Sequence, residues 1–238
     1  MEFLPMPHHV EHRAGTFRLT TAAQIVLCQA SEIRLHHAKM LQEDIRSFTG
    51  LSLGIIRGHS EEGDILLQVD KTLPADHHIL EITPASIVIR GGSDEAVLHG
   101  VVTLGQWLRR HGACLPCLYV ADHPDMPNRG YYQDISRGRI PTLASLKEMA
   151  DWLCRAKINE WQLYVEHTYL FRHESEAWRE DTPLTAEDIT ELDAYCQERC
   201  IQLVPSIASF GHMYLLLATK THARLCEMPD SEKGFSYN

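Results

Sequence analysis

The sequence predicts an α/β protein in which an N-terminal α+β sandwich domain precedes an incomplete (β/α)8 TIM barrel. Three strand-like segments lie in the second half, at residues 129–137, 159–168 and 201–205, and helix-like segments separate them. This alternation is typical of parallel βαβ units. Charged and titratable residues gather where these strands end, which is where such barrels build their active sites.

The length of the barrel-like segment limits how much of a barrel it can form. Residues 129–238 number 110, whereas a complete barrel takes about 250 residues. We therefore expect the first three to four strands of a barrel that is truncated in this chain. Because closure is what removes the open edges of a sheet, we expect either self-association through the open barrel edge or poor order after about Gly211.

The first 122 residues carry a different pattern, in which two amphipathic helices interrupt short alternating strands. Strands are predicted at 17–20, 24–28, 64–69, 78–83 and 86–90. Ser31 and Ser93 are the predicted N-caps of the two helices, which end near Phe48 and His111. The pattern favours an α+β sandwich whose helices cover one face of the sheet.

These patterns divide the chain into three parts. Residues 1–122 form the accessory α+β domain, residues 123–128 form a linker with two prolines, and residues 129–238 form the first part of the barrel. Within the barrel part, Ser145 with Glu148 predicts a capping box at the start of one helix. Thr185 with Asp188 predicts a weaker version before the next helix.

Composition and charge argue against several classes of protein. Charged residues make up 23% and hydrophobic residues 44% of the chain, as in soluble globular proteins. A net charge of −10 argues against a nucleic-acid partner. No apolar run approaches the ~20 residues that span a bilayer, and the first residues lack a signal-peptide pattern, so we expect a cytoplasmic protein without membrane contact. Seven cysteines fit reduced thiols better than a disulfide scaffold.

Two candidate residues lie on the first barrel strand. Arg129 offers a fork of five donors that suits sugar hydroxyls or a carboxylate, and an inter-domain salt bridge is the alternative. Asp134 shares one side of its strand with Tyr132 and Ser136, if the strand is half-buried and alternates. For Asp134 a supporting, structural role is favoured, as a buried carboxylate bonded to Arg137 or to backbone amides.

Three further candidates follow the second and third strands. Glu166 and His167 end the second strand, where the carboxylate and the imidazole could orient one another. His212 comes just after the third strand, and a helix-capping or buried structural role is its alternative. Parallel strands joined by right-handed crossovers place their C-terminal ends together, so we expect these three side chains at one common end of the sheet.

These residues also carry a resemblance to a known family. The positions concerned are Arg129-Gly130, Asp134, Ser136-Arg137, Asn159 and Gly211-His212. Together they resemble the start of the catalytic barrel of glycoside hydrolase family 20, the β-N-acetylhexosaminidases. The segments 164–171 and 209–213 are most similar to the branch that contains hexosaminidase D. The resemblance covers roughly residues 2–238 and is more specific in the second half.

The resemblance implies a hydrolase that removes a terminal β-linked N-acetylhexosamine from a glycan, without a cofactor and by a substrate-assisted retaining mechanism. It implies that Arg129 holds hydroxyls of the terminal sugar and that His212 belongs to the network beside the catalytic acid. Together with Arg129 and His212, Glu166 and His167 are assigned to substrate binding. His167 stands where much of the family has a carboxylate, and Ala208 stands where many members have Asp.

In the family an adjacent Asp-Glu pair at the end of the fourth strand performs the chemistry. No such pair follows His212 in this sequence, where the acidic and basic residues Glu227, Asp230, Glu232 and Lys233 lie in a polar, loop-like stretch. The catalytic residues of this chain are therefore unknown. We expect the acid pair downstream of Asn238 and expect the chain alone to be inactive.

Several metal-like patterns are interpreted as structural, and no metal site is predicted. Cys114 and Cys117 form a lone CxxC without a second pair. Cys196 and Cys200 lie one helical turn apart without a matching His. Three His-His pairs, at residues 8–9, 36–37 and 77–78, belong to three different elements. Adjacent side chains point to different sides of a strand or helix, which disfavours chelation by a pair.

The sequence leaves one rival from another class of protein, a non-catalytic module that binds a sugar or a protein partner through the α+β domain and an exposed sheet. The two hypotheses differ in whether the coding sequence continues past Asn238 into a strand that ends in Asp-Glu.

Overall fold

A computed structural model describes residues 2–178 and 181–226 of the chain. It contains two compact units, one formed by 1–127 with 155–157 and the other by 128–154 with 158–238. The main division, between Pro127 and Asn128, falls inside the segment 123–128 that the sequence assigns to a linker. Each unit is described by itself below.

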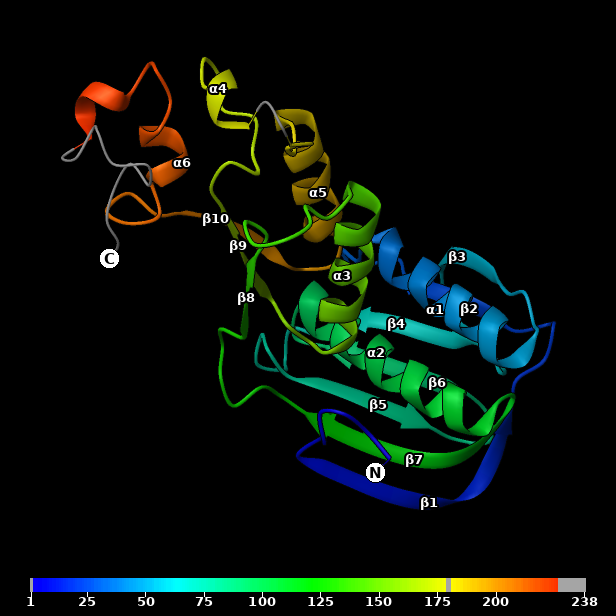
Figure 1. The fold of residues 1–238 in the computed structure, drawn as a ribbon. Helices are drawn as coiled ribbons and strands as arrows, with labels where there is room; N and C mark the ends of the chain where they lie inside the picture. The colour runs from blue at the N-terminus through cyan, green and yellow to red at the C-terminus, as the bar shows by residue number, and fades with distance from the viewer. Residues whose placement is uncertain (1, 179–180, 227–238) are drawn as a thin grey trace. The chain divides into compact units, whose positions relative to one another are not determined.

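The first unit is built on a seven-stranded mixed sheet (Figure 1). Its strands are β1 (His9–Arg18), β2 (Gln24–Cys28), β3 (Gly54–Gly58), β4 (Ile65–Val69), β5 (His78–Ile82), β6 (Ile87–Gly91) and β7 (Cys114–Asp122). Their order across the sheet is β1-β7-β5-β6-β4-β2-β3. β5 is antiparallel to both β6 and β7, and β1 is antiparallel to β7. The N-terminal end of β1 therefore lies beside the C-terminal end of β7.

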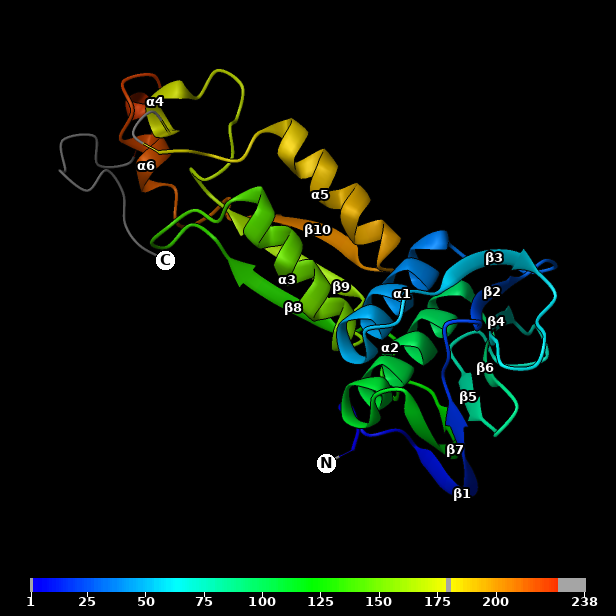
Figure 2. The same cartoon turned by 90° about the vertical axis from the view of Figure 1, so that its right-hand side faces the viewer.

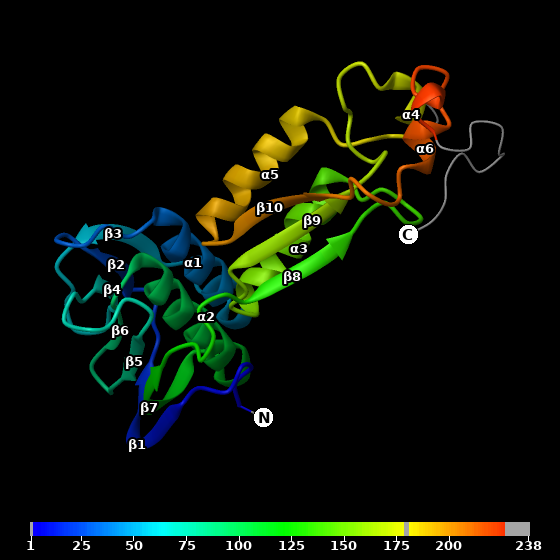
Figure 3. The same ribbon diagram turned by 90° about the vertical axis from the view of Figure 1, so that its left-hand side faces the viewer.

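Two long helices, α1 (Leu35–Thr49) and α2 (Asp94–His111), cover one face of this sheet (Figure 3). Alternate strand residues such as Leu80 and Ile82 meet buried helix residues such as Leu41, Val101 and Trp107 in one apolar core. The predicted α+β arrangement with both helices on one face is confirmed. Its large buried core is the main favourable term for folding of this unit.

The start of α1 differs from the prediction, because Ser31 is not its N-cap. Arg34 occupies that position and makes no side-chain capping bond. The Ser31 hydroxyl instead accepts a hydrogen bond from Val69 N at 3.0 Å, which joins the loop to β4. Gly50 ends the helix in the left-handed conformation with φ of 75°, as its lack of a Cβ permits.

The start of α2 agrees with the prediction, whereas two strands were missed. The Ser93 hydroxyl accepts a hydrogen bond from Ala96 N at 3.2 Å, and two acids in the first turn suit the helix dipole. Strands β3 and β7 were not predicted, and the strand predicted at 17–20 overlaps β1 only at Phe17 and Arg18. β3 begins and ends at Gly residues, and β7 contains Pro116, which lies beside an irregularity in its partner β1. Gly and Pro are both depleted in strands, so the residue patterns of β3 and β7 did not indicate strands.

The second unit contains a three-stranded parallel sheet of β8 (Gly130–Asp134), β9 (Glu160–Val165) and β10 (Gln202–Ile207). β9 lies between the other two strands, and both pairings are parallel, as predicted. Helix α3 (Leu143–Arg155) connects β8 to β9, and α5 (Ala186–Glu198) connects β9 to β10 (Figure 2). The short helices are α4 (Ser175–Trp178), α6 (Tyr214–Leu217) and a 3-10 turn at Ala223–Leu225.

Two local predictions for the second unit are corrected. β8 is not half-buried, because four of its five residues are exposed, as expected of a strand that pairs on one side with β9. Ser145 lies inside α3, and the cap is Thr142, whose hydroxyl accepts a hydrogen bond from Ser145 N at 3.2 Å. By contrast, the box predicted from Thr185 and Asp188 is complete, with hydrogen bonds in both directions.

Within the part of the chain that the structure describes, no helix is both long enough and apolar enough to span a bilayer. The polar residues Glu227, Asp230, Glu232 and Lys233, considered above, lie outside the described residues.

Candidate functional site

The candidate site lies at the C-terminal end of the parallel sheet in the second unit. Because β8, β9 and β10 run in the same direction, the segments that follow them emerge at one edge (Figure 3). Arg137 follows β8, Glu166 follows β9 directly, and His212 follows β10. The structure brings these three side chains into contact, and we call them the strand-end cluster.

Arg137 is the centre of the strand-end cluster. Its Nη1 donates to Oε1 of Glu166 at 2.8 Å, and its Nη2 donates to Nδ1 of His212 at 2.9 Å. It also donates to the Ser136 hydroxyl. The hydrogen bond and charge of Glu166 raise the pKa of Arg137 despite partial burial. A fixed guanidinium therefore joins groups from all three strands.

Glu166 is the most buried member, with 7% of its side chain exposed. Its Oε1 accepts from Arg137 and also from the hydroxyl of Tyr164 at 2.8 Å. Burial and the hydrogen bond to Glu166 raise the pKa of Tyr164 to about 12. Tyr164 therefore remains a donor through the neutral range and holds the carboxylate in place. Tyr132 stacks on the Tyr164 ring with centroids 6.0 Å apart.

His212 adopts an unusual backbone conformation, with a positive φ of 57°, which non-glycine residues visit rarely. A guanidinium can only donate, so Nδ1 of His212 must be the acceptor in its contact with Arg137. The proton of the neutral ring is then on Nε2, which makes that nitrogen a donor. With 59% of its side chain exposed, His212 can present this donor to a ligand.

Asp134 supports the turn that carries Arg137. Its Oδ1 accepts from the backbone N of Ser136 at 2.8 Å and from the Ser136 hydroxyl at 2.6 Å. Burial alone would raise the pKa of Asp134, but the two bonds from Ser136 and the charge of Arg137 lower it. The hydrogen bond to a backbone amide that the sequence favoured is observed, with a longer 3.8 Å contact to Arg137, but Asp134 is not buried, since 37% of its side chain is exposed.

His167 follows the same end of β9 as Glu166, but its described contact is with a different residue. Its Nε2 lies 3.7 Å from Oδ2 of Asp181, and the contacts described for it include none with Glu166. Consecutive side chains leave a strand on opposite sides, which explains the separation. Asp181 also lines a cavity with residues of α4 and α6.

Arg129 lies at the other end of β8, one residue before the strand begins. Its backbone N donates to Oδ1 of Asn159 at 2.9 Å, and its carbonyl accepts from Asn159 N at 3.1 Å. Five residues of strand separate it from the edge that carries the cluster, or roughly 16 Å at about 3.3 Å per residue. The structure therefore does not group Arg129 with Glu166 and His212, and its sugar-binding role stays a prediction.

Sequence reasoning did not assign Arg137 and Tyr164 to the site. Tyr164 could have been found from its spacing, since residues two apart on a strand share a face and Glu166 was already a candidate. Arg137 belongs to the quoted motif, but it was considered only as a partner of Asp134. Nothing in the sequence indicates that its side chain would reach both Glu166 and His212.

One cysteine of each of the two patterns, Cys117 and Cys196, is buried, and neither of them forms a disulfide. Cys114 is exposed and Cys117 is buried, because residues three apart on β7 point to opposite faces. Burial raises the pKa of Cys117 and, with nearby Asp193, raises that of Cys196 to about 12. Such thiols are poor nucleophiles and poor metal ligands.

The strand-end cluster can bind a polar, neutral ligand. It combines a buried carboxylate, a guanidinium and an exposed imidazole donor, which together offer acceptors and donors for paired hydroxyl groups. A second carboxylate, that of Asp134, lies 3.8 Å from the same Nη1 of Arg137 that binds Glu166 at 2.8 Å. The hydrogen bonds described above hold both carboxylates in place, so the cluster offers an ordered set of groups for binding and orienting a ligand.

Comparisons with known proteins show which family the chain is similar to. A family model described as glycosyl hydrolase family 20, domain 2, matches residues 1–123. A beta-hexosaminidase from Akkermansia muciniphila is 29% identical over 168 residues, which cover 62% of this chain and 34% of the relative. A beta-hexosaminidase from Vibrio furnissii is 26% identical over 240 residues, which cover 89% of this chain and 38% of the relative.

Solved structures share the fold over nearly the whole chain. A GH20 exo β-N-acetylglucosaminidase from Vibrio harveyi, in complex with N-acetylglucosamine, has a TM-score of 0.81 at 20% identity and covers 100% of this chain and 41% of that one. A GH20 β-N-acetylhexosaminidase from Streptomyces coelicolor A3(2) has a TM-score of 0.78 at 20% identity, with 96% and 50% covered. The chain thus spans half or less of the length of the relatives it matches.

Proposed function

The chain belongs to glycosyl hydrolase family 20, and from this membership we propose that it is the N-terminal part of an exo-acting β-N-acetylhexosaminidase. The parent protein would hydrolyse terminal β-linked N-acetylhexosamine from glycans. The observation that carries the proposal is the strand-end cluster, in which Arg137 holds Glu166 and His212 at one edge of the parallel sheet. The N-acetylglucosamine bound to the similar Vibrio harveyi protein supports the substrate class.

In this proposal the cluster binds hydroxyl groups of the terminal sugar. The carboxylate of Glu166 accepts hydrogen bonds, and Nε2–H of His212 donates one. Arg137 keeps both groups in position, because its two terminal nitrogens each bond to one of them. Substrate binding by Arg129 and by His167 is part of this proposal. Asp134 acts indirectly, because it holds the turn at Ser136.

We also propose that residues 129–238 are the first strands of a (β/α)8 barrel. The parallel order β8-β9-β10 with α3 and α5 as crossovers supports this architecture. The mechanism would be substrate-assisted and retaining, with the Asp-Glu pair supplied by a part of the parent protein outside these 238 residues. The absence of an adjacent Asp-Glu pair after His212 in the sequence supports that assignment.

Two measurements test the proposed function. The first is to read the coding sequence past codon 238, where we expect a further strand that ends in Asp-Glu. The second is an assay of the 238-residue chain with a chromogenic N-acetyl-β-glucosaminide, where we expect no turnover. A stop codon directly after Asn238 would overturn the hydrolase proposal and favour a sugar- or protein-binding module. Turnover abolished by Glu166→Gln would instead show that the acid lies within the chain.

A further inference from the structure

Three histidines from distant parts of the chain stack at one edge of the seven-stranded sheet. His8 precedes β1, His123 follows β7 and His77 precedes β5, and these strands are neighbours in the order β1-β7-β5. The rings of His8 and His123 are 4.1 Å apart and 6° from parallel. Those of His77 and His123 are 4.3 Å apart and 2° from parallel. Three imidazoles are thus held in register by the strand pairing.

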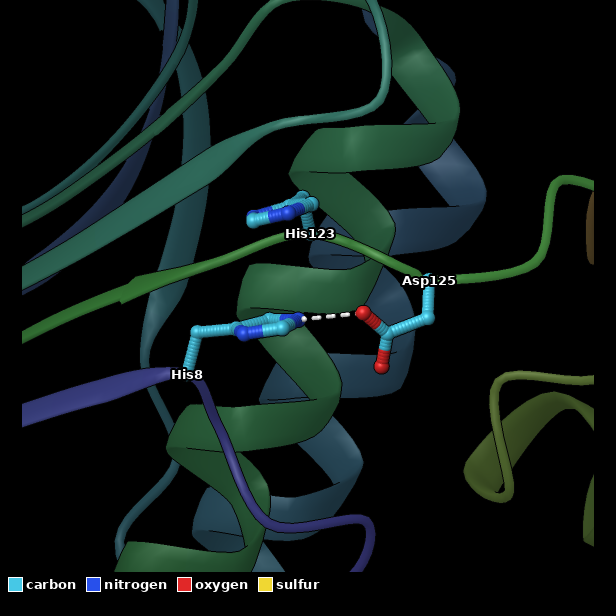
Figure 4. Close-up of side chains that lie close together, drawn as sticks. All are labelled: His8, His123 and Asp125. Atoms are coloured by element: carbon cyan, nitrogen blue, oxygen red, sulfur yellow. Dashed lines mark ion pairs between the residues drawn. The ribbon is translucent and has the colours of Figure 1, made fainter.

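Asp125 completes a set of ligand atoms on this stack (Figure 4). The Nε2 of His8 points toward Oδ1 of Asp125, and the two atoms are 3.3 Å apart. One nitrogen each from His8 and His123 and one oxygen of Asp125 all lie within 4.8 Å of one another. The side chains of His8 and Asp125 are 40% and 82% exposed, so an ion can reach them from solvent.

The spacing of His8 and Asp125 is compatible with two ligands of one metal ion. Two ligand atoms that each lie about 2.0–2.1 Å from a tetrahedral Zn²⁺ are about 3.3 Å apart. The distance of 3.3 Å between His8 Nε2 and Asp125 Oδ1 therefore matches the separation of two zinc ligands. The rings of His8 and His123 are stacked in the metal-free chain, and imidazole coordinates a metal in the plane of its ring, so the His123 ring must turn out of the stack to supply the third ligand.

We propose that His8, His123 and Asp125 form a binding site for a divalent transition-metal ion of the Zn²⁺ type. Imidazole nitrogens select Zn²⁺, Cu²⁺ or Ni²⁺, whereas Mg²⁺ and Ca²⁺ require oxygen ligands. Three protein ligands leave a fourth position for water. The ion joins the segment before β1 to the segment after β7, so its binding stabilises the folded state of the first unit by mass action.

His77 is a positioning residue for this site. It covers the far face of the His123 ring, and its own Nδ1 lies 2.7 Å from Oδ1 of Asp76. A carboxylate behind an imidazole fixes the orientation of the ring, as seen around many metal ligands. The stack therefore sets the position of the His123 ring in the metal-free chain, from which the ring turns to reach the ion, and His77 does not itself touch the ion.

The test is metal titration of the untagged, chelator-treated 238-residue chain. Isothermal titration with Zn²⁺ should give one saturable site, and Co²⁺ should give visible bands of a tetrahedral ion without a thiolate charge-transfer band. His8→Ala and Asp125→Asn should each weaken binding at least tenfold, and His77→Ala only a few-fold. His59→Ala, at an exposed histidine of the same unit, is the matched control and should leave binding unchanged.

A second readout separates loss of a ligand from loss of the fold. Zn²⁺ should raise the thermal unfolding midpoint of the native chain and of His59→Ala, and should leave that of His8→Ala and Asp125→Asn unchanged. Circular dichroism of the metal-free variants establishes that they are folded. The proposal is overturned if Zn²⁺ does not saturate, if folded His8→Ala and Asp125→Asn retain native affinity, or if Co²⁺ shows thiolate ligation.

Discussion

The Nη1 of Arg137 lies 2.8 Å from Oε1 of Glu166, although 29 residues separate the two side chains along the chain. The ion pair links the segment after β8 to the end of β9. Glu166 is nearly buried whereas about half of Arg137 is exposed, so the carboxylate depends on this partner more than the guanidinium does. Loss of the carboxylate charge should therefore affect both stability and ligand binding.

Glu166→Gln should destabilise the second unit by about 1–3 kcal/mol, because Arg137 and Tyr164 both lose a charged acceptor. Urea unfolding followed by tryptophan fluorescence measures the change in free energy. Glu187→Gln, at an exposed acid on α5, is the matched control and should stay within about 0.5 kcal/mol of the native chain. Equal stabilities for the two variants would show that the Arg137–Glu166 pair contributes nothing measurable.

Tyr164 should make stability depend on pH in the alkaline range. Its pKa is raised to about 12 in the folded chain, whereas an unfolded tyrosine titrates near 10. The folded state then holds an extra proton between these values, so its contribution to stability is full below about pH 10 and is lost as the pH rises toward 12. Tyr164→Phe should remove this loss.

The measurement for Tyr164 is a pair of alkaline titrations, one of tyrosinate absorbance and one of urea stability. Tyr164→Phe should delete one late-titrating tyrosine from the absorbance curve. Tyr131→Phe, at an exposed position on β8, is the control and should keep that late step. A late step that survives in Tyr164→Phe would place the perturbed tyrosine elsewhere.

For the second unit, the sequence predicts which strand ends meet but not how their side chains connect. The parallel order follows from strand–helix alternation alone, and it brings Glu166 and His212 to one edge as expected. Arg137 was not predicted as a site residue, because its contacts depend on the path of the turn after β8. The hydrogen bonds from Ser136 to Asp134 fix that path. Such a turn is set by tertiary geometry rather than by periodicity.

For the first unit, the sequence predicts the layers but not the histidine stack. The adjacent side chains of His77 and His78 point in different directions, as expected. His78 is buried, whereas His77 stacks on His123. The three stacked histidines come from the ends of neighbouring strands instead. The stack therefore requires β7 to lie between β1 and β5. β7 itself was missed because of Pro116, so this pairing could not be predicted from local patterns.

His78 should make the first unit less stable in mild acid. Burial, followed by the charges of Lys157, His77 and His123, lowers its pKa well below 6.5. It faces Thr103 at 3.5 Å and Asp122 at 3.8 Å. The unfolded state then binds a proton below about pH 6.5 that the folded state does not. Stability from this group is therefore full above that pH and falls by up to about 1.4 kcal/mol per pH unit below it.

The measurement for His78 is the urea unfolding free energy between about pH 5 and 6.5, where most carboxylates are still ionised. His78→Gln should flatten the dependence, whereas His59→Gln, at an exposed position, should keep the native slope. Identical slopes for His78→Gln and the native chain would show that another group causes the acid sensitivity.

Gly92 should tolerate no side chain, because the chain approaches itself closely at this position. A Cβ added there would lie 1.9 Å from the carbonyl oxygen of Pro74, a backbone atom that cannot move without displacing the loop. Gly92 N also donates to the carbonyl of His77 at 2.9 Å, so the same loop positions the histidine stack. We expect Gly92→Ala to destabilise the first unit by about 3 kcal/mol or more, at the upper end of overpacking costs.

Gly54→Ala provides the matched control for Gly92→Ala, since an added Cβ on β3 meets nothing within 4 Å. There the substitution should be neutral or should stabilise by up to about 1 kcal/mol, because alanine reduces the freedom of the unfolded chain. The unfolding free energy should thus fall for Gly92→Ala and should stay unchanged or rise for Gly54→Ala, in both thermal and urea unfolding. A Gly92→Ala chain as stable as Gly54→Ala would mean that the loop at Pro74 can move away, and that it does not fix the position of His77.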